Sequence, residues 1–247
     1  MSEPKRQLFP LVVADAALFC VEDGRLKVLL VQRSVAPERG RWALPGGILR
    51  PGEDGSLEDT ARRILKDKTG VRVPYLEQVA TFSGPDRDPR GWSVCTLFYA
   101  LVERERLPVP AQSGTELTDW CDAVGLTRRL AFDHARLLAA ALARLKERVG
   151  GDKAPARNAN PHSPHRARGP VAVQTALPLH LMPEKFTLTQ LQRTIEAILD
   201  GPIDKGAFRR RLKEAEAGAI VAVPGEFIRG AQRPAQLYRA ARGAVFR

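Results

Sequence analysis

Apolar runs divide the first 150 residues into expected strands and helices. Residues 11–21 (LVVADAALFCV) and 27–33 (KVLLVQR) flank Glu22-Asp23-Gly24, a sequence typical of tight turns. This order predicts a β-hairpin that enters a buried sheet. The same pattern predicts further strands at 42–44, 75–83 and 92–102, and a short edge strand around 118–123.

A helix is expected at 130–149, LAFDHARLLAAALARLKERV, which Asp133 or the residues before it can cap. Its apolar residues recur at helical spacing on one face: Leu137, Leu138, Ala141, Leu142 and Leu145. His134 stands alone in this stretch. Because no second catalytic partner is visible nearby, a capping or packing role is favoured over a role as a base.

A change of composition follows this helix. Residues 150–170, GGDKAPARNANPHSPHRARGP, contain seven Gly or Pro in 21 positions and no large apolar side chain. Such a segment cannot bury enough surface to become ordered, so it predicts a flexible linker. We therefore expect one domain at 1–149, a linker at 150–170 and a second domain at 171–247.

The second domain is expected to begin with a pair of helices. In FTLTQLQRTIEAILDG (186–201), Thr189 and Gln192 have the spacing of a capping box, and Asp200-Gly201 is typical of a helix end. After a tight turn, Asp204 can cap KGAFRRRLKEAEA. The spacing places an apolar stripe on the inner face of this second helix and basic side chains opposite: Phe208, Leu212 and Ala215 inside, and Arg209, Arg210 and Lys213 outside.

Two β-like runs, 219–223 and 235–240, follow and bracket PGEFIRGAQRP. Helix, tight turn, basic helix and basic hairpin in this order predict a winged helix-turn-helix that binds double-stranded DNA. A small α+β packing module with a solvated arginine face is the alternative. The expected DNA-binding residues are Thr187, Thr189, Lys205, Arg209, Arg210, Lys213, Arg229 and Arg233.

Charge supports this division. Residues 1–150 carry 23 Lys or Arg against 20 Asp or Glu, whereas residues 151–247 carry 16 against 8. Excess positive charge on a small domain is typical of nucleic-acid binding, although a solvated basic face is common too. No apolar run is long enough to cross a membrane, and three widely spaced cysteines indicate neither disulfides nor zinc. These features fit a reducing cytoplasm.

Residues 41–71, RWALPGGILRPGEDGSLEDTARRILKDKTGV, resemble a Nudix box, written G-x5-E-x7-R-E-U-x-E-E-x-G-U with U apolar. Two extra residues lengthen the middle. In the Nudix family, glutamates on one helix face hold Mg2+, which bridges phosphates and activates water. Those positions here are Ile64, Asp67 and Lys68. The resemblance therefore implies a site that keeps its shape without metal, cofactor or catalysis. An ordinary amphipathic helix after a Gly-Gly turn is the alternative.

Arginines can bind phosphate without a metal. The segment GPDRDPRG (84–91) has the composition of an anion-contacting turn, or equally of a solvated hairpin loop. Arg63 is as plausible a structural partner for Glu53 as it is a phosphate ligand. The ligand-binding candidates are Arg41, Glu53, Arg62, Arg63, Asp67, Lys68, Arg87 and Arg90.

The chain as a whole resembles the Nudix-related transcriptional regulators of the NrtR family. The resemblance is carried by WALPGG (42–47), RDPRG (87–91), LAFDHA (130–135), FTLTQLQR (186–193), DKGAFRRRL (204–212) and RPAQLYR (233–239). It implies an α/β fold, a Nudix α/β/α sandwich with a mixed sheet, followed by an α+β winged helix-turn-helix domain. It also implies a homodimeric repressor of NAD-metabolism genes that reads a palindromic operator and senses ADP-ribose or a similar nucleotide sugar.

Three points bear on this interpretation. Gly206 and Ala207 stand where larger polar residues are expected in the recognition helix, so the operator sequence stays open. A Mg2+-dependent pyrophosphatase for ADP-ribose or nucleotide sugars, with an accessory basic domain, is the rival function, and the replaced acids argue against it. An RNA-binding protein is a third possibility, but no aromatic platform for single strands is visible.

Overall fold

The computed structural model describes residues 9–70, 72–107, 117–150, 176–214, 219–228 and 234–241. The chain divides into two compact units. Unit 1 comprises Met1–Glu22 and Leu26–Leu142, and unit 2 comprises Asp23–Arg25 and Ala143–Arg247. Apart from Gly150, the predicted linker at 150–170 lies outside the described residues.

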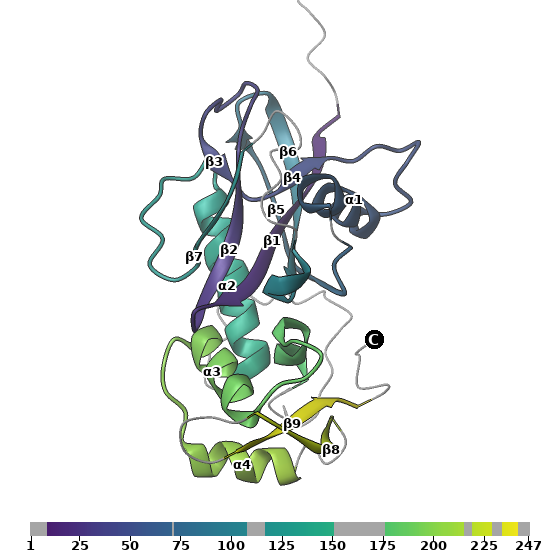
Figure 1. Ribbon diagram of the computed structural model, residues 1–247. Coiled ribbons are helices and arrows are strands. Elements are labelled where there is room, and N and C mark those ends of the chain that lie inside the picture. The colour runs from purple at the N-terminus through teal and green to yellow at the C-terminus, as the bar shows by residue number, and fades with distance from the viewer. Residues whose placement is uncertain are drawn as a thin grey trace, which may run out of the picture. The chain divides into compact units, whose positions relative to one another are not determined.

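Unit 1 is built on a mixed sheet of seven strands (Figure 1). The strands are β1 (Leu11–Glu22), β2 (Arg25–Gln32), β3 (Trp42–Ala43), β4 (Gly46–Ile48), β5 (Tyr75–Asp88), β6 (Gly91–Leu101) and β7 (Thr118–Asp122). β1 is central: it runs parallel to β6, and its first half pairs antiparallel with β4. β5 pairs with β6, while β3 and β7 pair with β2.

The predicted hairpin and strands are confirmed, with one difference in length. Asp23 and Gly24 adopt left-handed conformations, with φ of 51° and 71°, as the turn between β1 and β2 requires. The segment 84–91, expected to be a loop, instead continues β5 as far as Asp88. The strand accommodates these Gly and Pro residues through a register shift between Gly84 and Asp88.

Two helices cover the sheet of unit 1. Helix α1 (Leu57–Thr69) is capped by the Ser56 hydroxyl and ends at Gly70, whose φ is 72°. It packs against β1, β4 and β5. Ala61 and Leu65 of α1 share a buried cluster with alternate residues of β1, namely Ala14, Ala16, Leu18 and Cys20. The intervening β1 residues face the other side of the sheet, where α2 (His134–Gly150) begins.

The helix pair predicted in unit 2 is present. A short 3-10 helix, η2 (Leu177–Leu181), precedes α3 (Leu188–Leu199) and α4 (Lys205–Glu214). The predicted position of the capping box was wrong, because the pair that caps α3 is Thr187 with Gln190. Asp200 ends α3 in a left-handed conformation, with φ of 59°. Asp204 caps α4 as expected, accepting from the Ala207 N–H at 2.7 Å.

A two-stranded antiparallel hairpin completes unit 2. Its strands are β8 (Ile220–Ile228) and β9 (Ala235–Ala240). β8 extends further than expected, through a bulge that includes Gly225 at φ 75°. Phe186, just before α3, exchanges two backbone hydrogen bonds with Tyr238, of 2.9 and 2.8 Å. The hairpin is therefore tied directly to the start of α3.

Candidate functional site

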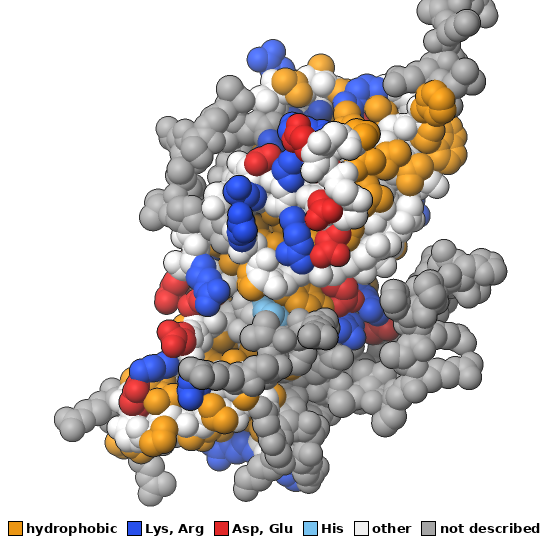
Figure 2. Space-filling model, turned by 90° about the vertical axis from the view of Figure 1, so that its right-hand side faces the viewer, with side chains coloured by type: hydrophobic (Ala, Val, Ile, Leu, Met, Phe, Trp, Pro, Cys, Tyr) orange, Lys and Arg blue, Asp and Glu red, His pale blue; other side chains and the backbone are white. Residues whose placement is uncertain are grey.

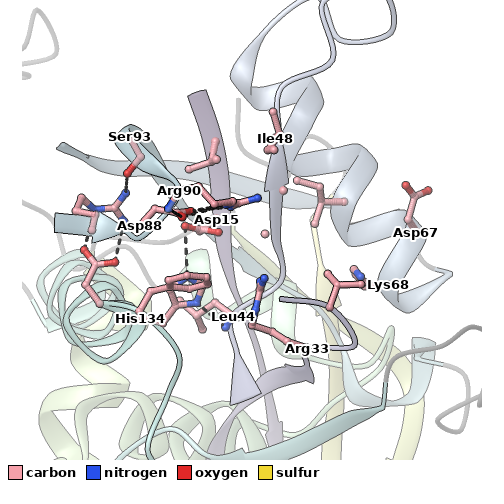
Figure 3. Close-up of a pocket in the computed structure, with 18 of the residues that line it drawn as sticks. Asp15, Arg33, Leu44, Ile48, Asp67, Lys68, Asp88, Arg90, Ser93 and His134 are labelled. Atoms are coloured by element: carbon pink, nitrogen blue, oxygen red, sulfur yellow. Dashed lines mark hydrogen bonds and ion pairs between the residues drawn. The ribbon is translucent and has the colours of Figure 1, made fainter. Parts of the chain in front are cut away.

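A cavity of about 630 Å3 opens in unit 1 between the glycine turn, α1 and the residues that precede α2. Basic and acidic side chains from distant parts of the sequence converge on it (Figure 3). Its lining comprises Val13, Asp15, Arg33, Val35, Leu44, Gly46, Gly47, Ile48, Arg50, Arg63, Ile64, Asp67, Lys68, Arg87, Asp88, Arg90, Ser93, Thr118, Phe132, Asp133 and His134. Its size suits a small ligand of nucleotide dimensions.

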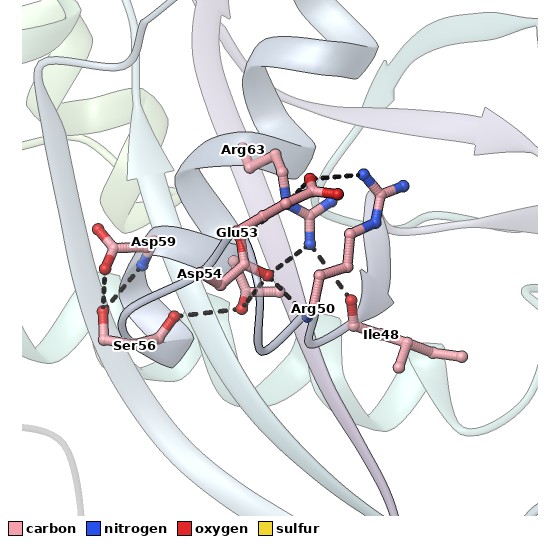
Figure 4. A network of polar contacts seen from close by, with 8 residues as sticks. Ile48, Arg50, Glu53, Asp54, Ser56, Asp59 and Arg63 are labelled. Atoms are coloured by element: carbon pink, nitrogen blue, oxygen red, sulfur yellow. Dashed lines mark hydrogen bonds and ion pairs between the residues drawn. The ribbon is translucent and has the colours of Figure 1, made fainter.

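Arg63 is held by Asp54, an acid that lies in the two-residue extension of the Nudix motif (Figure 4). Its Nε and Nη2 each donate to a different carboxylate oxygen of Asp54 at 2.7 Å. Nη2 also donates to the Ile48 carbonyl at 3.2 Å. Glu53, the expected partner, is 4.0 Å from Arg63 and instead pairs with Arg50 at 2.9 Å. Arg63 therefore fastens α1 to the loop before it.

The pKa values of this pair reflect the contact. Hydrogen bonds from Arg63 hold the pKa of Asp54 well below its usual range, and the same bonds raise the pKa of Arg63. The Thr60 hydroxyl and the Arg50 N–H also donate to Asp54, each at 3.0 Å. This bidentate pair makes a rigid wall element, and it occupies the Nε and Nη2 edge of the Arg63 guanidinium.

The two arginines of the 84–91 segment are also paired. Arg87 forms two hydrogen bonds of 2.8 Å with Asp133 and one of 3.3 Å with the Ser93 hydroxyl. Arg90 binds Asp88, with Nη2 to Oδ2 at 2.6 Å. Burial lowers the pKa of Arg87, but the hydrogen bond to Asp133 and the acidic groups nearby together raise it overall. Asp88 likewise raises the pKa of Arg90.

At the floor of the cavity two buried polar side chains, Cys95 and His134, flank the buried carboxylate of Asp15. The Cys95 thiol donates to Asp15 Oδ2 at 2.9 Å, and His134 Nε2 lies 3.7 Å from the same oxygen. His134 Nδ1 accepts from the Leu44 backbone N–H at 3.0 Å. Burial lowers the pKa of His134, so the site disfavours the protonated ring. His134 has the packing role that the sequence favoured, because it fixes the glycine turn to the start of α2.

The metal-ligand positions of the Nudix motif do not fit a divalent cation. Ile64 is buried with only 4% of its surface exposed. Asp67 is exposed at the cavity rim, and Lys68 contributes an ammonium group. Among the residues that the structure describes, no cluster of three His, Cys, Asp or Glu side chains is placed to hold a metal. Hard cations need several oxygen ligands, and this face offers one carboxylate.

Five of the eight expected ligand residues line the cavity: Arg63, Asp67, Lys68, Arg87 and Arg90. The other three do not. Arg62 is exposed on α1 and pairs with Glu58 at 2.8 Å. Acidic and basic side chains intermingle on the face of the molecule shown in Figure 2. Arg41 pairs with Glu38 at 2.7 Å.

Sequence reasoning missed Arg33, which follows β2 and belongs to no motif. Its guanidinium lies over the Phe132 ring, 4.7 Å from the ring centre, and its Nε donates to the Pro37 carbonyl at 2.8 Å. Phe132 itself adopts a left-handed backbone, with φ of 50°. A strained non-glycine residue beside a cavity is typical of a functional site.

In unit 2, α4 presents the basic face that the sequence predicted. Phe208 and Leu212 are buried, whereas Lys205, Arg209 and Arg210 are exposed. Glu196 fixes the turn before α4, because its carboxylate accepts from the Ile203 N–H at 3.1 Å and from Gln192 at 2.9 Å.

The remaining DNA-binding candidates have different settings. Thr187 is buried and its hydroxyl caps α3, whereas Thr189 is exposed. Arg229, Arg233 and the side chain of Lys213 lie outside the described residues. Gln236 supports the hairpin, since its Nε2 lies 2.7 Å from the Val223 carbonyl and 3.0 Å from that of Glu226. None of the helices in the described residues combines the length and apolarity needed to span a membrane.

Comparison with known proteins identifies both units. Residues 11–141 match the NUDIX domain, and residues 178–240 match the NrtR DNA-binding winged helix domain. The ADPR responsive transcriptional repressor NtrR of Acinetobacter baylyi is 41% identical over 231 residues, which cover 93% of this chain and 82% of that protein.

Solved structures of NrtR proteins are similar to this chain as well. The structure of Shewanella oneidensis NrtR complexed with a 27mer DNA superposes with a TM-score of 0.77 at 34% identity, covering 95% of each chain. The NUDIX domain of the same NrtR, complexed with ADP ribose, is 42% identical with a TM-score of 0.52, and covers 58% of this chain and 94% of that one. The chain therefore belongs to the NrtR family, with a Nudix domain followed by a winged helix domain.

Proposed function

We propose that this protein is a transcriptional repressor whose Nudix cleft binds ADP-ribose or a similar nucleotide sugar and whose winged helix binds operator DNA. One observation carries the proposal: a Nudix cleft in which Ile64 and Lys68 occupy two metal-ligand positions of the motif belongs to the same chain as a helix-turn-helix with an exposed basic face. The relative in Acinetobacter baylyi, similar over 93% of this chain, is an ADPR-responsive repressor.

The geometry of α4 supports a DNA interface on this helix. Helix α3 and the turn held by Glu196 present α4 with Lys205, Arg209 and Arg210 toward solvent. A second helix of this kind enters the major groove, where arginines contact guanine edges and phosphates. A homodimer places two such helices on the two halves of a palindromic operator. This operator lies upstream of NAD-metabolism genes, and the repressor acts in the cytoplasm.

The cleft acts as a sensor and not as an enzyme in this proposal. Ile64 and Lys68 remove two of the carboxylates that a Nudix hydrolase uses to hold Mg2+. The walls of the cavity nevertheless persist, fixed by the Arg63–Asp54 and Arg87–Asp133 pairs. A ligand-responsive repressor needs a cleft that binds the ligand, but it does not need to hydrolyse it.

A DNA mobility-shift titration tests this function. The probe is the DNA upstream of the protein's own gene, titrated with and without ADP-ribose, and a scrambled duplex of equal length serves as the control. The expected result is salt-sensitive, sequence-selective binding that ADP-ribose weakens.

Two results contradict the proposal. Equal affinity for the upstream DNA and the scrambled duplex refutes sequence-specific operator binding. A mobility shift that saturating ADP-ribose leaves unchanged refutes the sensor role of the cleft. Release of AMP from ADP-ribose in Mg2+, at rates typical of Nudix hydrolases, supports the pyrophosphatase instead.

A further inference from the structure

The arginines that line the cavity fall into two classes. Arg50, Arg63, Arg87 and Arg90 each form an ion pair with a carboxylate, at distances between 2.6 and 2.9 Å. These arginines build the wall, because their charges are already balanced. Arg33 is different: in the part of the chain that the structure describes, no carboxylate forms an ion pair with its guanidinium.

Arg33 is rigidly placed although it is not ion-paired. Its backbone N–H donates to the Arg41 carbonyl at 2.9 Å, and its carbonyl accepts from the Gly40 N–H at 2.8 Å. The Phe132 ring holds the guanidinium in place, and the Pro37 carbonyl accepts a hydrogen bond from Nε alone. Within the described residues, its two terminal nitrogens have no acceptor. They form a preorganised fork suited to bidentate contact with phosphate oxygens.

Lys68 reaches the same region of the cavity from α1 (Figure 3). Burial lowers the pKa of Lys68, and the nearby charge of Arg33 lowers it further, while Asp67 opposes both effects. Burial also lowers the pKa of Arg33, and the charge of Arg90 adds to this effect. Two neighbouring cations that burial disfavours are stabilised when an anion binds between them.

We propose that Arg33 and Lys68 bind the diphosphate group of the ligand directly and take the place of the divalent cation that the Nudix motif uses. Lys68 stands at one of the motif's glutamate positions, so a positive side chain replaces a metal ligand. The guanidinium fork contacts one phosphate and the ammonium group the other, and each phosphate carries a negative charge. The cleft then binds its ligand without Mg2+.

This inference rests on the proposed function, because it assigns the anion-binding part of the sensor cleft. Isothermal titration calorimetry tests it with two probes, ADP-ribose and inorganic pyrophosphate, each in EDTA and in excess Mg2+. The variants are Arg33→Ala and Lys68→Ala. Matched controls are Arg39→Ala, exposed in the loop after Arg33, and Lys66→Ala, exposed on α1; neither residue lines the cavity.

The wild-type protein is expected to bind ADP-ribose equally well in EDTA and in Mg2+. Each cavity variant weakens binding of both probes by about tenfold or more, the usual effect of losing hydrogen bonds to a charged group. Arg33→Lys retains the charge but loses the fork, so it gives an intermediate loss. The control variants bind as the wild type does, and thermal unfolding confirms that all variants are folded.

Three outcomes overturn the inference. ADP-ribose binding that requires Mg2+, or binding that survives in both Arg33→Ala and Lys68→Ala, refutes it and leaves the sensor function standing. Wild-type protein that binds neither probe refutes the inference and the sensor together. Wild-type protein that binds pyrophosphate but not ADP-ribose supports the anion site and refutes the proposed ligand.

Discussion

Replacing Gly46 by Ala tests how closely the glycine turn approaches the floor of the cavity. A Cβ at Gly46 would lie 1.7 Å from Asp15 Oδ1 and 2.9 Å from Asp15 Cγ. Asp15 is only 6% exposed, and restoring ordinary contact requires its carboxylate to move by roughly 1.7 Å. Such a movement breaks the hydrogen bond from the Cys95 thiol, so the substitution strains the core of the site.

The loss of folding free energy caused by Gly46→Ala has two parts. Overpacking costs about 1 to 3 kcal/mol, and leaving a buried polar group without its partner costs about 1 to 3 kcal/mol more. Gly47→Ala is the matched control, because its Cβ would meet only the end of the Ile64 side chain, at 3.1 and 3.3 Å. That side chain can rotate, so a cost below about 1.5 kcal/mol is expected.

Equilibrium urea unfolding followed by tryptophan fluorescence measures the difference, because Trp42, Trp92 and Trp120 all lie in unit 1. Gly46→Ala should lower the free energy of unfolding by about 2 to 6 kcal/mol and weaken ADP-ribose binding. If Gly46→Ala and Gly47→Ala unfold at the same urea concentration, the close approach to Asp15 is not a constraint and the reasoning fails.

Other substitutions address the metal site, the DNA interface and pH. Ile64→Glu with Lys68→Glu restores carboxylates on α1, so Mg2+ should raise the melting temperature of this double variant but not of the wild type. Arg209→Ala with Arg210→Ala should abolish operator binding without changing unfolding, since both side chains are exposed. Burial lowers the pKa of His134 below 6.5, so the unfolded chain binds this proton first and stability falls as the pH drops through that value. His134→Asn, which can still accept from the same backbone N–H, should remove this part of the pH dependence.

Each of these expectations has a contrary result. If Mg2+ does not change the melting temperature of the double glutamate variant, this face of α1 cannot hold a cation. Unchanged operator affinity in the double alanine variant at moderate salt moves the DNA interface away from α4. A pH profile of stability between about 5 and 7 that His134→Asn leaves unaltered shows that other groups cause it.

Much of the fold could be predicted because local signals agreed with tertiary packing. Asp23-Gly24 predicted the turn between β1 and β2, and the apolar spacing of 130–149 predicted α2. The position of the capping box could not be fixed in the same way, since Thr187–Gln190 and Thr189–Gln192 have identical spacing. Thr187 was selected by the backbone pairing of Phe186 with Tyr238, a contact between residues far apart in the sequence.

The candidate site was only partly predictable, because motifs identify residue types and not their partners. Arg63 matches the Nudix motif, yet the two-residue extension brings Asp54 and not Glu53 into its reach. Arg87 and Arg90 line the cavity as expected, but Arg87 forms an ion pair with Asp133, from another segment, and Arg90 forms one with its near neighbour Asp88. Arg33 carried no signal, since its importance comes from the stacking on Phe132 and from the absence of an ion-pair partner within the described residues.

The central claim is that one ligand and one DNA site are coupled through this chain. Coupling is reciprocal, so ADP-ribose must bind the operator complex more weakly than the free protein by the same factor by which it weakens DNA binding, typically about 5- to 150-fold. Calorimetric titration of ADP-ribose into the free protein and into its operator complex measures this factor directly. ADP-ribose is expected to bind the operator complex more weakly than the free protein, and equal affinity in the two titrations would contradict the coupling.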